Sequence, residues 1–443
     1  MNLPEDFIKM LKNDLGETKA SEVISDMAKE PSVAIRINPS KIDSPMIGQT
    51  LAHLPIAGNV PHCKTGFFLS QRPSFTHDPL FHAGAYYVQD ASSMIVEKIL
   101  EYIDNKEFRA LDLCAAPGGK STHLISLLDR YENSLVVCNE VIRTRATILA
   151  ENIAKWGYPN VCVTNNDPAD FSSLENYFDI ILVDAPCSGE GMFRKDEGAI
   201  AEWSLENVHL CAQRQRRIVA DIWPALANGG IMAYSTCTIN REEDEENVEW
   251  ICKELKGEQL YSRRFYPGGE DAGEGIFFAI IRKEGEEIQR ENRKNFSTPK
   301  TLSKYPAKVD LVKDGYTLFK KKEILKCYPK EIANEMIALE GKLKVIHSGV
   351  AVAEVLESKK GAPVIIPHTD LVQSKAYNRG AIPELEISLE QALAFLKREP
   401  LTLPQGAAKG YILLTFNTLP LGLVKNLGNR TNNLWPNSRR ILK

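Results

Sequence analysis

The feature that most constrains the fold is an alternation of short apolar runs with longer amphipathic stretches, which begins near Arg109. Apolar, β-branched runs bounded by turn residues predict buried strands, and the stretches between them have helical spacing. This alternation is typical of an α/β protein with a parallel, doubly wound sheet, whose ligands bind beyond the carboxyl ends of the strands. We expect the strands at 110–114, 134–138, 160–164, 178–183, 230–234 and 275–280.

The sequence on either side predicts two further units. Residues 1–104 are expected to form a small α/β domain, and residues 105–283 the sheet unit. The polar, charged stretch 284–304 is the predicted linker to a mixed α+β unit, 305–443. Helices are expected near Phe7, at 94–103 and at 331–339, a strand at 32–38, and short strands and turns over 345–357. A helix is also expected to start at 242–246, capped by Asn240 and Glu243.

Charge is distributed unevenly along the chain, although the net charge is only -4. Residues 291–443 hold 25 Lys and Arg against 14 Asp and Glu, a balance of +11, whereas residues 1–290 have a balance of -15. A basic tail on an acidic body favours contact with a polyanion such as RNA, although solvated lysines alone give the same count.

The nine cysteines are far apart and include no C-x-x-C pair, so the spacing predicts no zinc framework and we expect no metal. No apolar run is long enough for a signal peptide or a membrane span, which predicts a cytoplasmic protein with reduced thiols. Free buried cysteines are usually small core residues, and this is the expectation for Cys63, Cys138, Cys162, Cys211, Cys252 and Cys327.

The turn after the first predicted strand has the composition of a ligand-binding loop. It consists of Cys114, Ala115, Ala116, Pro117, Gly118, Gly119 and Lys120. The two glycines let a ligand approach the backbone, and the free N–H groups of the following helix attract carboxylate or phosphate. Both the G-x-G-x-x-G of dinucleotide sites and the glycine spacing of a P-loop are absent. A tight turn without a ligand is the alternative.

Carboxylates end the next three strands at the same edge of the sheet. Glu140 follows the second strand, 21 residues after Gly119, where an acid can accept both hydroxyls of a ribose. Asp167 ends the third strand, in reach of an adenine, and Asp184 ends the fourth. One such carboxylate is more often a helix cap, but three in succession favour a nucleoside cofactor without a pyrophosphate. S-adenosylmethionine is the leading candidate.

Cys187 and Cys237 differ from the other cysteines because each lies just past a strand end, among small polar residues. Carbon 5 of a pyrimidine is a poor nucleophile until a thiolate has added to carbon 6, so a thiol at the site suits its methylation. A carboxyl group such as that of Asp184, near ring N3, would stabilise the adduct. These residues alone leave open which thiol attacks.

An ordered set of motifs resembles one family of enzymes. The motifs are LDLCAAPGGKS (111–121), Asn139-Glu140, DAPCSGEGMFRKD (184–196) and STCT (235–238), with RINP (36–39), YVQDASS (87–93), RFYP (264–267) and GEGIFFA (273–279). They are similar to those of the Sun family of RNA cytosine-5 methyltransferases, over about residues 30–283. The resemblance implies a Rossmann-like core that holds S-adenosylmethionine through residues 114–120, Glu140, Asp167 and Asp184. It also implies that Cys237 attacks, that Cys187 assists release of the methylated RNA, and that Lys195 contacts the substrate.

The C-terminal run LGLVKNLGNRTNNLWPNSRR (421–440), with 349–354 and Pro367-His368, resembles the PUA-like extension of the RsmF-type bacterial rRNA enzymes. Trp435 stands where that family usually has a tyrosine. The resemblance agrees with the basic balance and implies an RNA-binding extension.

The resulting hypothesis is methylation of carbon 5 of a cytosine in 16S rRNA, free or within an assembled small subunit, by a monomer. Methylation of an amino group is a rival activity, but its Asn/Asp-Pro-Pro-aromatic stretch is replaced here by Asp184-Ala185-Pro186-Cys187. A catalytically idle RNA-binding assembly factor is the alternative from another class, and it would need neither the thiols nor the cofactor carboxylates.

Overall fold

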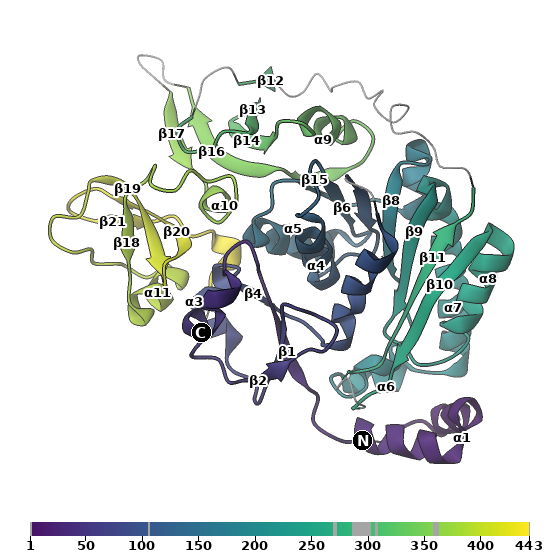
Figure 1. The fold of residues 1–443 in the computed structure, drawn as a ribbon. Helices are drawn as coiled ribbons and strands as arrows, with labels where there is room; N and C mark the ends of the chain where they lie inside the picture. Colours follow the sequence, from purple (N-terminus) through teal and green to yellow (C-terminus); the bar gives the residue numbers. More distant parts are fainter. Residues whose placement is uncertain are drawn as a thin grey trace.

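An eight-stranded sheet forms the centre of the molecule (Figure 1). The computed structural model describes residues 2–104, 107–268, 273–285, 303–305, 309–357 and 363–442. The strands of the central sheet are β5 (Arg109–Asp112), β6 (Leu135–Asn139), β7 (Val161–Thr164), β8 (Phe178–Asp184), β9 (Leu226–Thr236), β10 (Gly257–Phe265), β11 (Ile276–Lys283) and β15 (Val345–Ser348). They lie in the order β10-β11-β9-β8-β5-β6-β7-β15.

The five inner strands are parallel, as the alternating pattern predicted. β9, β8, β5, β6 and β7 pair in parallel, whereas β11 and β15 run antiparallel to their neighbours. The chain moves outward from β5 to β7 and then returns to β8 on the other side of β5. The order of strands therefore reverses between β5 and β8, which is where doubly wound sheets bind their ligands.

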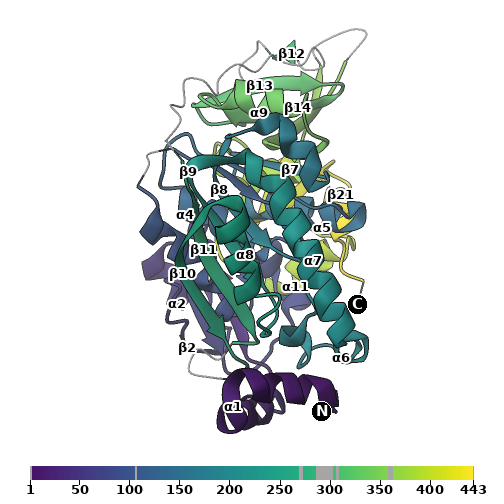
Figure 2. The ribbon, with the colours of Figure 1, turned by 90° about the vertical axis from the view of Figure 1, so that its right-hand side faces the viewer.

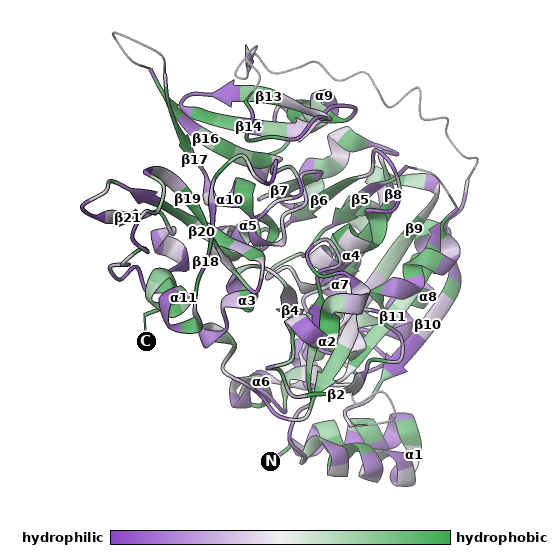
Figure 3. Ribbon diagram, turned by 60° about the vertical axis from the view of Figure 1, so that its left-hand side comes forward, coloured by the Kyte–Doolittle hydropathy of each residue, from purple (hydrophilic) through white to green (hydrophobic). Residues whose placement is uncertain are grey.

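Helices cover both faces of this sheet. α4 (Gly119–Leu128), α5 (Arg143–Trp156) and the 3-10 helix η3 (Ser92–Tyr102) pack on one face, and α7 (Leu205–Ile222) and α8 (Glu245–Leu255) on the other (Figure 2). Both faces are buried, because Ile180 and Leu182 belong to one core cluster and Ile181 and Val183 to the other. The central strands are accordingly mostly green in Figure 3. Short helices complete the unit: η4 (Pro168–Leu174), η5 (Glu190–Met192), α6 (Glu197–Glu202) and η6 (Trp223–Ala225).

The N-terminal unit is an antiparallel sheet of order β2-β3-β1-β4, preceded along the chain by a long helix that packs against Trp203 and Val208 of the central unit. Its elements are α1 (Glu5–Met27), β1 (Val33–Ile37), η1 (Ser44–Met46), α2 (Ile47–Thr50), β2 (Ile56–Asn59), β3 (Gly66–Leu69), η2 (Phe75–His77), α3 (Pro79–His82) and β4 (Tyr86–Val88). The predicted helix near Phe7 and strand at 32–38 are confirmed. The helix expected at 94–103 is instead the 3-10 helix η3, whose period of three places Val96 and Ile99 on one buried side.

The C-terminal part of the chain joins the central sheet. β15 pairs with β7, with Val345 opposite Thr164. The short strands and turns expected within 345–357 are two strands, since the chain turns at Gly349, where φ is 58°. After that turn β16 (Val350–Leu356) enters a second sheet with β12 (Ser303–Lys304), β13 (Tyr316–Lys321), β14 (Ile324–Pro329) and β17 (Val364–Pro367), beside α9 (Ala333–Leu339) and α10 (Thr369–Val372). Residues 286–302 of the predicted linker lie outside the described residues.

The last part of the chain is a small sheet that packs against the N-terminal unit. It contains β18 (Glu384–Glu386), α11 (Leu389–Leu396), β19 (Gly410–Phe416), β20 (Leu419–Asn426), β21 (Thr431–Asn433) and η8 (Asn437–Arg439). Ile35 of β1 and Phe395 of α11 share one core cluster with the fully buried Trp435. The C-terminus consequently lies beside α3 (Figure 1). Among the described residues, no helix is both long and apolar enough to cross a membrane.

Candidate active site

Two thiols meet beyond the carboxyl ends of β8 and β9. The parallel register places Asp184 opposite Ser235, so Cys187 and Cys237 follow their strands by nearly the same number of residues. The two Sγ atoms are 2.8 Å apart, and the backbone N–H of Cys237 donates to Cys187 Sγ at 3.3 Å. Both side chains are partly exposed, unlike a core cysteine. The hydrogen bond with Cys237, together with burial, raises the pKa of Cys187 well above that of a free thiol.

Asp184 lies beside the thiols and is held on two sides. Its Oδ1 is 2.8 Å from Lys120 Nζ and accepts a hydrogen bond from Ser235 Oγ at 3.1 Å. Burial lowers the pKa of Lys120, but the charge and hydrogen bond of Asp184 and the nearby Cys237 outweigh burial and raise it. Lys120 is therefore a fixed cation between the turn that follows β5 and the two thiols. Spacing along the sequence did not predict this position.

A buried polar cluster supports both thiol-bearing loops. Asn240 Nδ2 donates to Glu190 and to Glu243, each at 2.9 Å, and Ser188 Oγ also donates to Glu243. Gln215 of α7 donates to Glu243 at 2.6 Å and to the carbonyl oxygen of Pro186 at 3.1 Å. The cluster thus links the loop of Cys187 to the loop of Cys237. The sequence did not indicate that this cluster links the two loops, although Ser188 and Glu190 lie within the DAPCSGEG motif.

Glu243 in particular differs from its predicted role. Asn240 Oδ1 does accept from the N–H of Glu243 at 2.9 Å, so half of the capping box is present. The Glu243 carboxylate, however, points into the polar cluster, and α8 begins only at Glu245. Burial, with Glu190 beside it, raises the pKa of Glu243 to about 7. The prediction of a capping box was wrong because the carboxylate has buried donors in another segment.

Three segments of the chain, those of Gly191, Cys237 and Gly275, lie in direct backbone contact beside the thiols. A Cβ added at Gly191 would lie 2.1 Å from the carbonyl oxygen of Gly275 and 3.0 Å from that of Cys237. The N–H of Gly191 donates to the Cys237 carbonyl at 2.9 Å. Glycine is required there because only a residue without a side chain allows this contact. The motifs at 184–196, 235–238 and 273–279 are therefore one site in space.

The predicted cofactor turn lies between β5 and α4, next to the thiols. Gly118 has φ of 114°, and a Cβ there would lie 3.2 Å from Leu149 Cδ1, so the turn needs glycine. The Pro117 carbonyl accepts from Asn152 at 2.8 Å and from Tyr87 at 3.2 Å, which fixes the turn against α5 and β4. Asp112 beneath it is fully buried, which raises its pKa to about 7, and its Oδ1 has no partner among the described residues.

Two further carboxylates lie along the same edge, with different partners. Glu140 is 3% exposed; its Oε1 accepts from the N–H of Ile142 at 2.9 Å and its Oε2 is 3.3 Å from Arg145. Asp167 caps η4, since its Oδ1 accepts from the N–H of Ala169 at 3.2 Å within a complete capping box. The cap was the alternative that sequence left open for such residues. The second carboxylate oxygen of Asp167 can still accept a hydrogen bond from a ligand.

Lys195 lies at the rim of the site and joins three motifs. Its Nζ is 3.4 Å from Asp90 Oδ2 and 4.0 Å from Glu274 Oε1. The side chain is about one-third exposed. Arg194 pairs with the same Glu274, which is buried and also accepts from the backbone N–H of Ser32 at 3.0 Å. Lys195 is thus an oriented cation beside the thiol-bearing loops.

The residues present fit a nucleoside cofactor such as S-adenosylmethionine. The glycine turn allows close approach, and Asp112 offers a buried oxygen without a partner next to it. Glu140 directly follows β6, at the position where the sequence predicted contacts to ribose hydroxyls. The switch point between β5 and β8 opens onto both the turn and Asp184.

Family models match three stretches of the chain. The 16S rRNA methyltransferase RsmB/F model matches residues 98–282. The N-terminal domain of 16S rRNA methyltransferase RsmF matches residues 3–91, and the methyltransferase RsmF PUA domain matches residues 382–441. The PUA match is shorter than the C-terminal unit predicted from the sequence, and it corresponds to the small sheet with α11.

Similar solved structures have the same fold. A methyltransferase homologue from Pyrococcus horikoshii is 28% identical with a TM-score of 0.55, and covers 63% of this chain and 95% of its own. The structure of NSun6 from Pyrococcus horikoshii with SFG is 21% identical with a TM-score of 0.55, and covers 64% and 99%.

Curated relatives extend the similarity to nearly the whole chain. Ribosomal RNA small subunit methyltransferase F of Aliivibrio salmonicida is 32% identical over 85% of this chain and 84% of its own length. The protein of that name from Shewanella woodyi is 29% identical over 98% of this chain and 96% of its own. This chain therefore belongs to the RsmF family of small-subunit ribosomal RNA methyltransferases.

Proposed function

We propose that this rRNA methyltransferase methylates carbon 5 of a cytosine in 16S rRNA, with S-adenosylmethionine as methyl donor. The observation that carries the proposal is the pair of thiols, 2.8 Å apart between their Sγ atoms and next to Asp184, at the carboxyl ends of β8 and β9. Amino-group methylation needs no thiol, and an idle scaffold needs neither the thiols nor the cofactor turn. A pair of thiols suits covalent activation of a pyrimidine ring.

The roles are those that the family resemblance implies, and the arrangement of the side chains supports them. Cys237 adds as thiolate to carbon 6 of the cytosine, and the cation of Lys120 nearby favours the negative charge on that sulfur. Asp184 binds near ring N3 and stabilises the adduct. When bound, S-adenosylmethionine supplies the methyl group to carbon 5. A base then removes the proton from carbon 5, the bond between carbon 6 and Cys237 Sγ breaks, and Cys237 leaves as thiolate. Cys187, beside Cys237, assists this release of the methylated RNA.

The target base has to leave its stack to reach this site. The thiols lie at the end of loops supported by a buried cluster, and Lys195 is oriented at the rim. A flipped or unpaired cytosine is accordingly the substrate that we infer. We expect Lys195 to contact the RNA. Its ammonium group pairs with Asp90, but one-third of the side chain is exposed and accessible to a phosphate.

Substitution of each thiol tests the two roles. We expect Cys187→Ala to accumulate a denaturation-resistant RNA–protein adduct on gels, because release is impaired. Cys237→Ala should form neither adduct nor product, whereas Cys252→Ala, a half-buried cysteine on α8, should behave as wild type. An adduct formed by Cys237→Ala would show that the roles are assigned wrongly.

The methylated atom is tested separately. RNA carrying tritium at carbon 5 of cytosine should release one tritium for each methyl group transferred, since methylation displaces that hydrogen. Methyl transfer without tritium release would place the methyl group on another atom. Mapping 5-methylcytosine in 16S rRNA from a deletion strain would then identify the position, and an unchanged map would contradict the proposed activity.

A further inference from the structure

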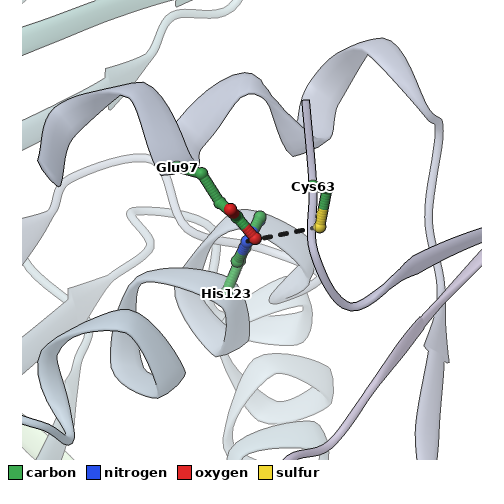
Figure 4. Close-up of side chains that lie close together, drawn as sticks. All are labelled: Cys63, Glu97 and His123. Atoms are coloured by element: carbon green, nitrogen blue, oxygen red, sulfur yellow. Dashed lines mark hydrogen bonds and ion pairs between the residues drawn. The ribbon is translucent and has the colours of Figure 1, made fainter. Parts of the chain in front are cut away.

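A second cluster of reactive side chains lies away from the catalytic thiols. Cys63 comes from the loop between β2 and β3, Glu97 from η3 and His123 from α4 (Figure 4). Cys63 Sγ is 3.8 Å from His123 Nε2, which is 3.4 Å from Glu97 Oε1. One potential ligand atom of each residue lies within 4.8 Å of the other two. Cys63 and His123 are almost completely buried, and Glu97 is slightly exposed.

These distances are close to those of a tetrahedral zinc site. With bond lengths of about 2.0–2.3 Å, ligand atoms around zinc are separated by about 3.3–3.5 Å. The distance from Cys63 Sγ to His123 Nε2 exceeds this separation by only a few tenths of an ångström, and the distance from His123 Nε2 to Glu97 Oε1 already matches it. The chemical set of one thiolate, one imidazole and one carboxylate is also one that zinc prefers.

The backbone around the cluster holds the ligands in place. The N–H of Lys64 donates to Glu97 Oε1 at 3.1 Å, which orients the carboxylate toward His123. Cys63 lies in a tight loop, in which its N–H donates to the carbonyl of Val60 and its carbonyl accepts from the N–H of Gly66, each at 3.1 Å. Outer hydrogen bonds of this kind reduce the cost of ordering metal ligands.

The charges also permit a divalent ion. A thiolate and a carboxylate together neutralise Zn²⁺, so the buried Arg36, which donates to Thr122 next to His123, faces a centre without net charge. Cys63 would bind zinc as a thiolate. Binding breaks the S–H bond, forms the Zn–S bond and releases one proton to solvent, without any change of oxidation state.

We propose that Cys63, Glu97 and His123 bind one zinc ion, with water in the fourth position. The ion would fasten the β2–β3 loop of the N-terminal sheet to η3 and to α4, the helix that starts at the cofactor turn. Its role is structural, since none of the three residues touches the catalytic thiols. Sequence spacing could not suggest the site, because its ligands are separated by 34 and 26 residues and contain no pair motif.

Metal content of the full-length protein tests the site. Protein expressed in zinc-supplemented medium and purified without chelator should carry one zinc ion per chain, measured by plasma mass spectrometry. Cys63→Ser and His123→Asn should each weaken Zn²⁺ binding by at least about 100-fold, the upper end of what loss of an outer partner causes. Cys327→Ser, which removes another buried thiol on β14, should keep the zinc.

Cobalt gives a spectroscopic readout of metal binding by the wild-type protein. Co²⁺ added to the metal-free chain should produce a thiolate-to-cobalt charge-transfer band, and Cys63→Ser, with folding checked by circular dichroism, should lack it. Wild-type protein that binds neither ion, or a cobalt band that persists in Cys63→Ser, would overturn the proposal. The three side chains would then be a hydrogen-bonded group only.

Discussion

At the scale of single residues, the site depends on how buried carboxylates are matched with donors. Asp184 faces a lysine and a hydroxyl, while Glu243 and Glu190 share one buried cluster with Asn240. The sequence identified Asp184 by its place after a strand. It did not predict that the Glu243 carboxylate is buried, because the donors Ser188 and Gln215 come from other segments of the chain. A carboxylate's position relative to a strand is a local property, whereas its solvation is not.

The raised pKa of Glu243 predicts a pH dependence of stability. Its pKa is about 7 in the folded protein, above that of an unfolded glutamate, so folding retains a proton between about pH 4.5 and pH 7. Stability contributed in this way is present below that window and is lost as pH rises through it. Glu243→Gln should therefore reduce the loss of unfolding free energy between about pH 5 and pH 8, by at most about 3 kcal/mol.

The measurement is denaturant unfolding of wild type and variant at several pH values. Part of the slope should persist in Glu243→Gln, because Asp112 also has a pKa raised to about 7. Glu246→Gln, an exposed neighbour on α8, is the matched control and should keep the wild-type slope. An unchanged slope in Glu243→Gln would mean that the group is ionised throughout.

At the scale of elements, the C-terminal part of the chain completes the catalytic sheet. β15 adds to β7, and α9 is tied to β5 by a two-pronged ion pair between Arg109 and Glu335, with both N–O distances 2.6 Å. Phe319, Tyr328 and Met336 belong to the same core cluster as strand residues of the central sheet. The predicted linker therefore connects segments that share one core.

Loss of this ion pair should destabilise the protein strongly. Glu335→Ala leaves two donors of the largely buried Arg109 without their acceptor, which should lower the free energy of unfolding by about 3 kcal/mol. Replacing both partners by apolar residues, Arg109→Met with Glu335→Leu, should cost less than the single change. Denaturant unfolding measures both, with the exposed Glu331→Ala as control. A loss below about 1 kcal/mol, typical of a surface pair, would contradict the prediction.

At the scale of the whole molecule, four core clusters of the described residues cross the boundaries that the sequence suggests. One joins the N-terminal sheet to the small C-terminal sheet, and another joins α1 to Trp203 and Val208 of the central unit. The C-terminal small sheet presents Lys409 and Arg430 on its surface, with Lys425 over the ring of Tyr411 at 5.1 Å. Basic side chains next to a partly exposed aromatic ring are suited to single-stranded RNA.

This surface predicts a graded salt dependence of RNA binding. Lys409→Ala and Arg430→Ala should each reduce the slope of log Kd against log salt by about 0.7, and the double variant by about 1.4, as expected for lost phosphate contacts. Filter binding or fluorescence anisotropy at several salt concentrations measures the slope. Lys253→Ala on α8, an exposed lysine, should leave it unchanged. Equal slopes in all variants would place the RNA elsewhere.

The sequence by itself determined the parallel sheet and the position of each strand-end residue, since apolar period and turn chemistry are local. It also determined, through the order of its motifs, the family. Only the tertiary structure decided that Cys187 and Cys237 touch, that Glu243 is buried, and that β15 belongs to the catalytic sheet. These facts depend on strand register and on contacts between segments far apart in the sequence: the two thiols are 50 residues apart, and β7 and β15 are more than one hundred apart. Periodicity along the chain carries no information on such pairings, because they depend on which sheet and helix faces are buried against one another in the folded protein.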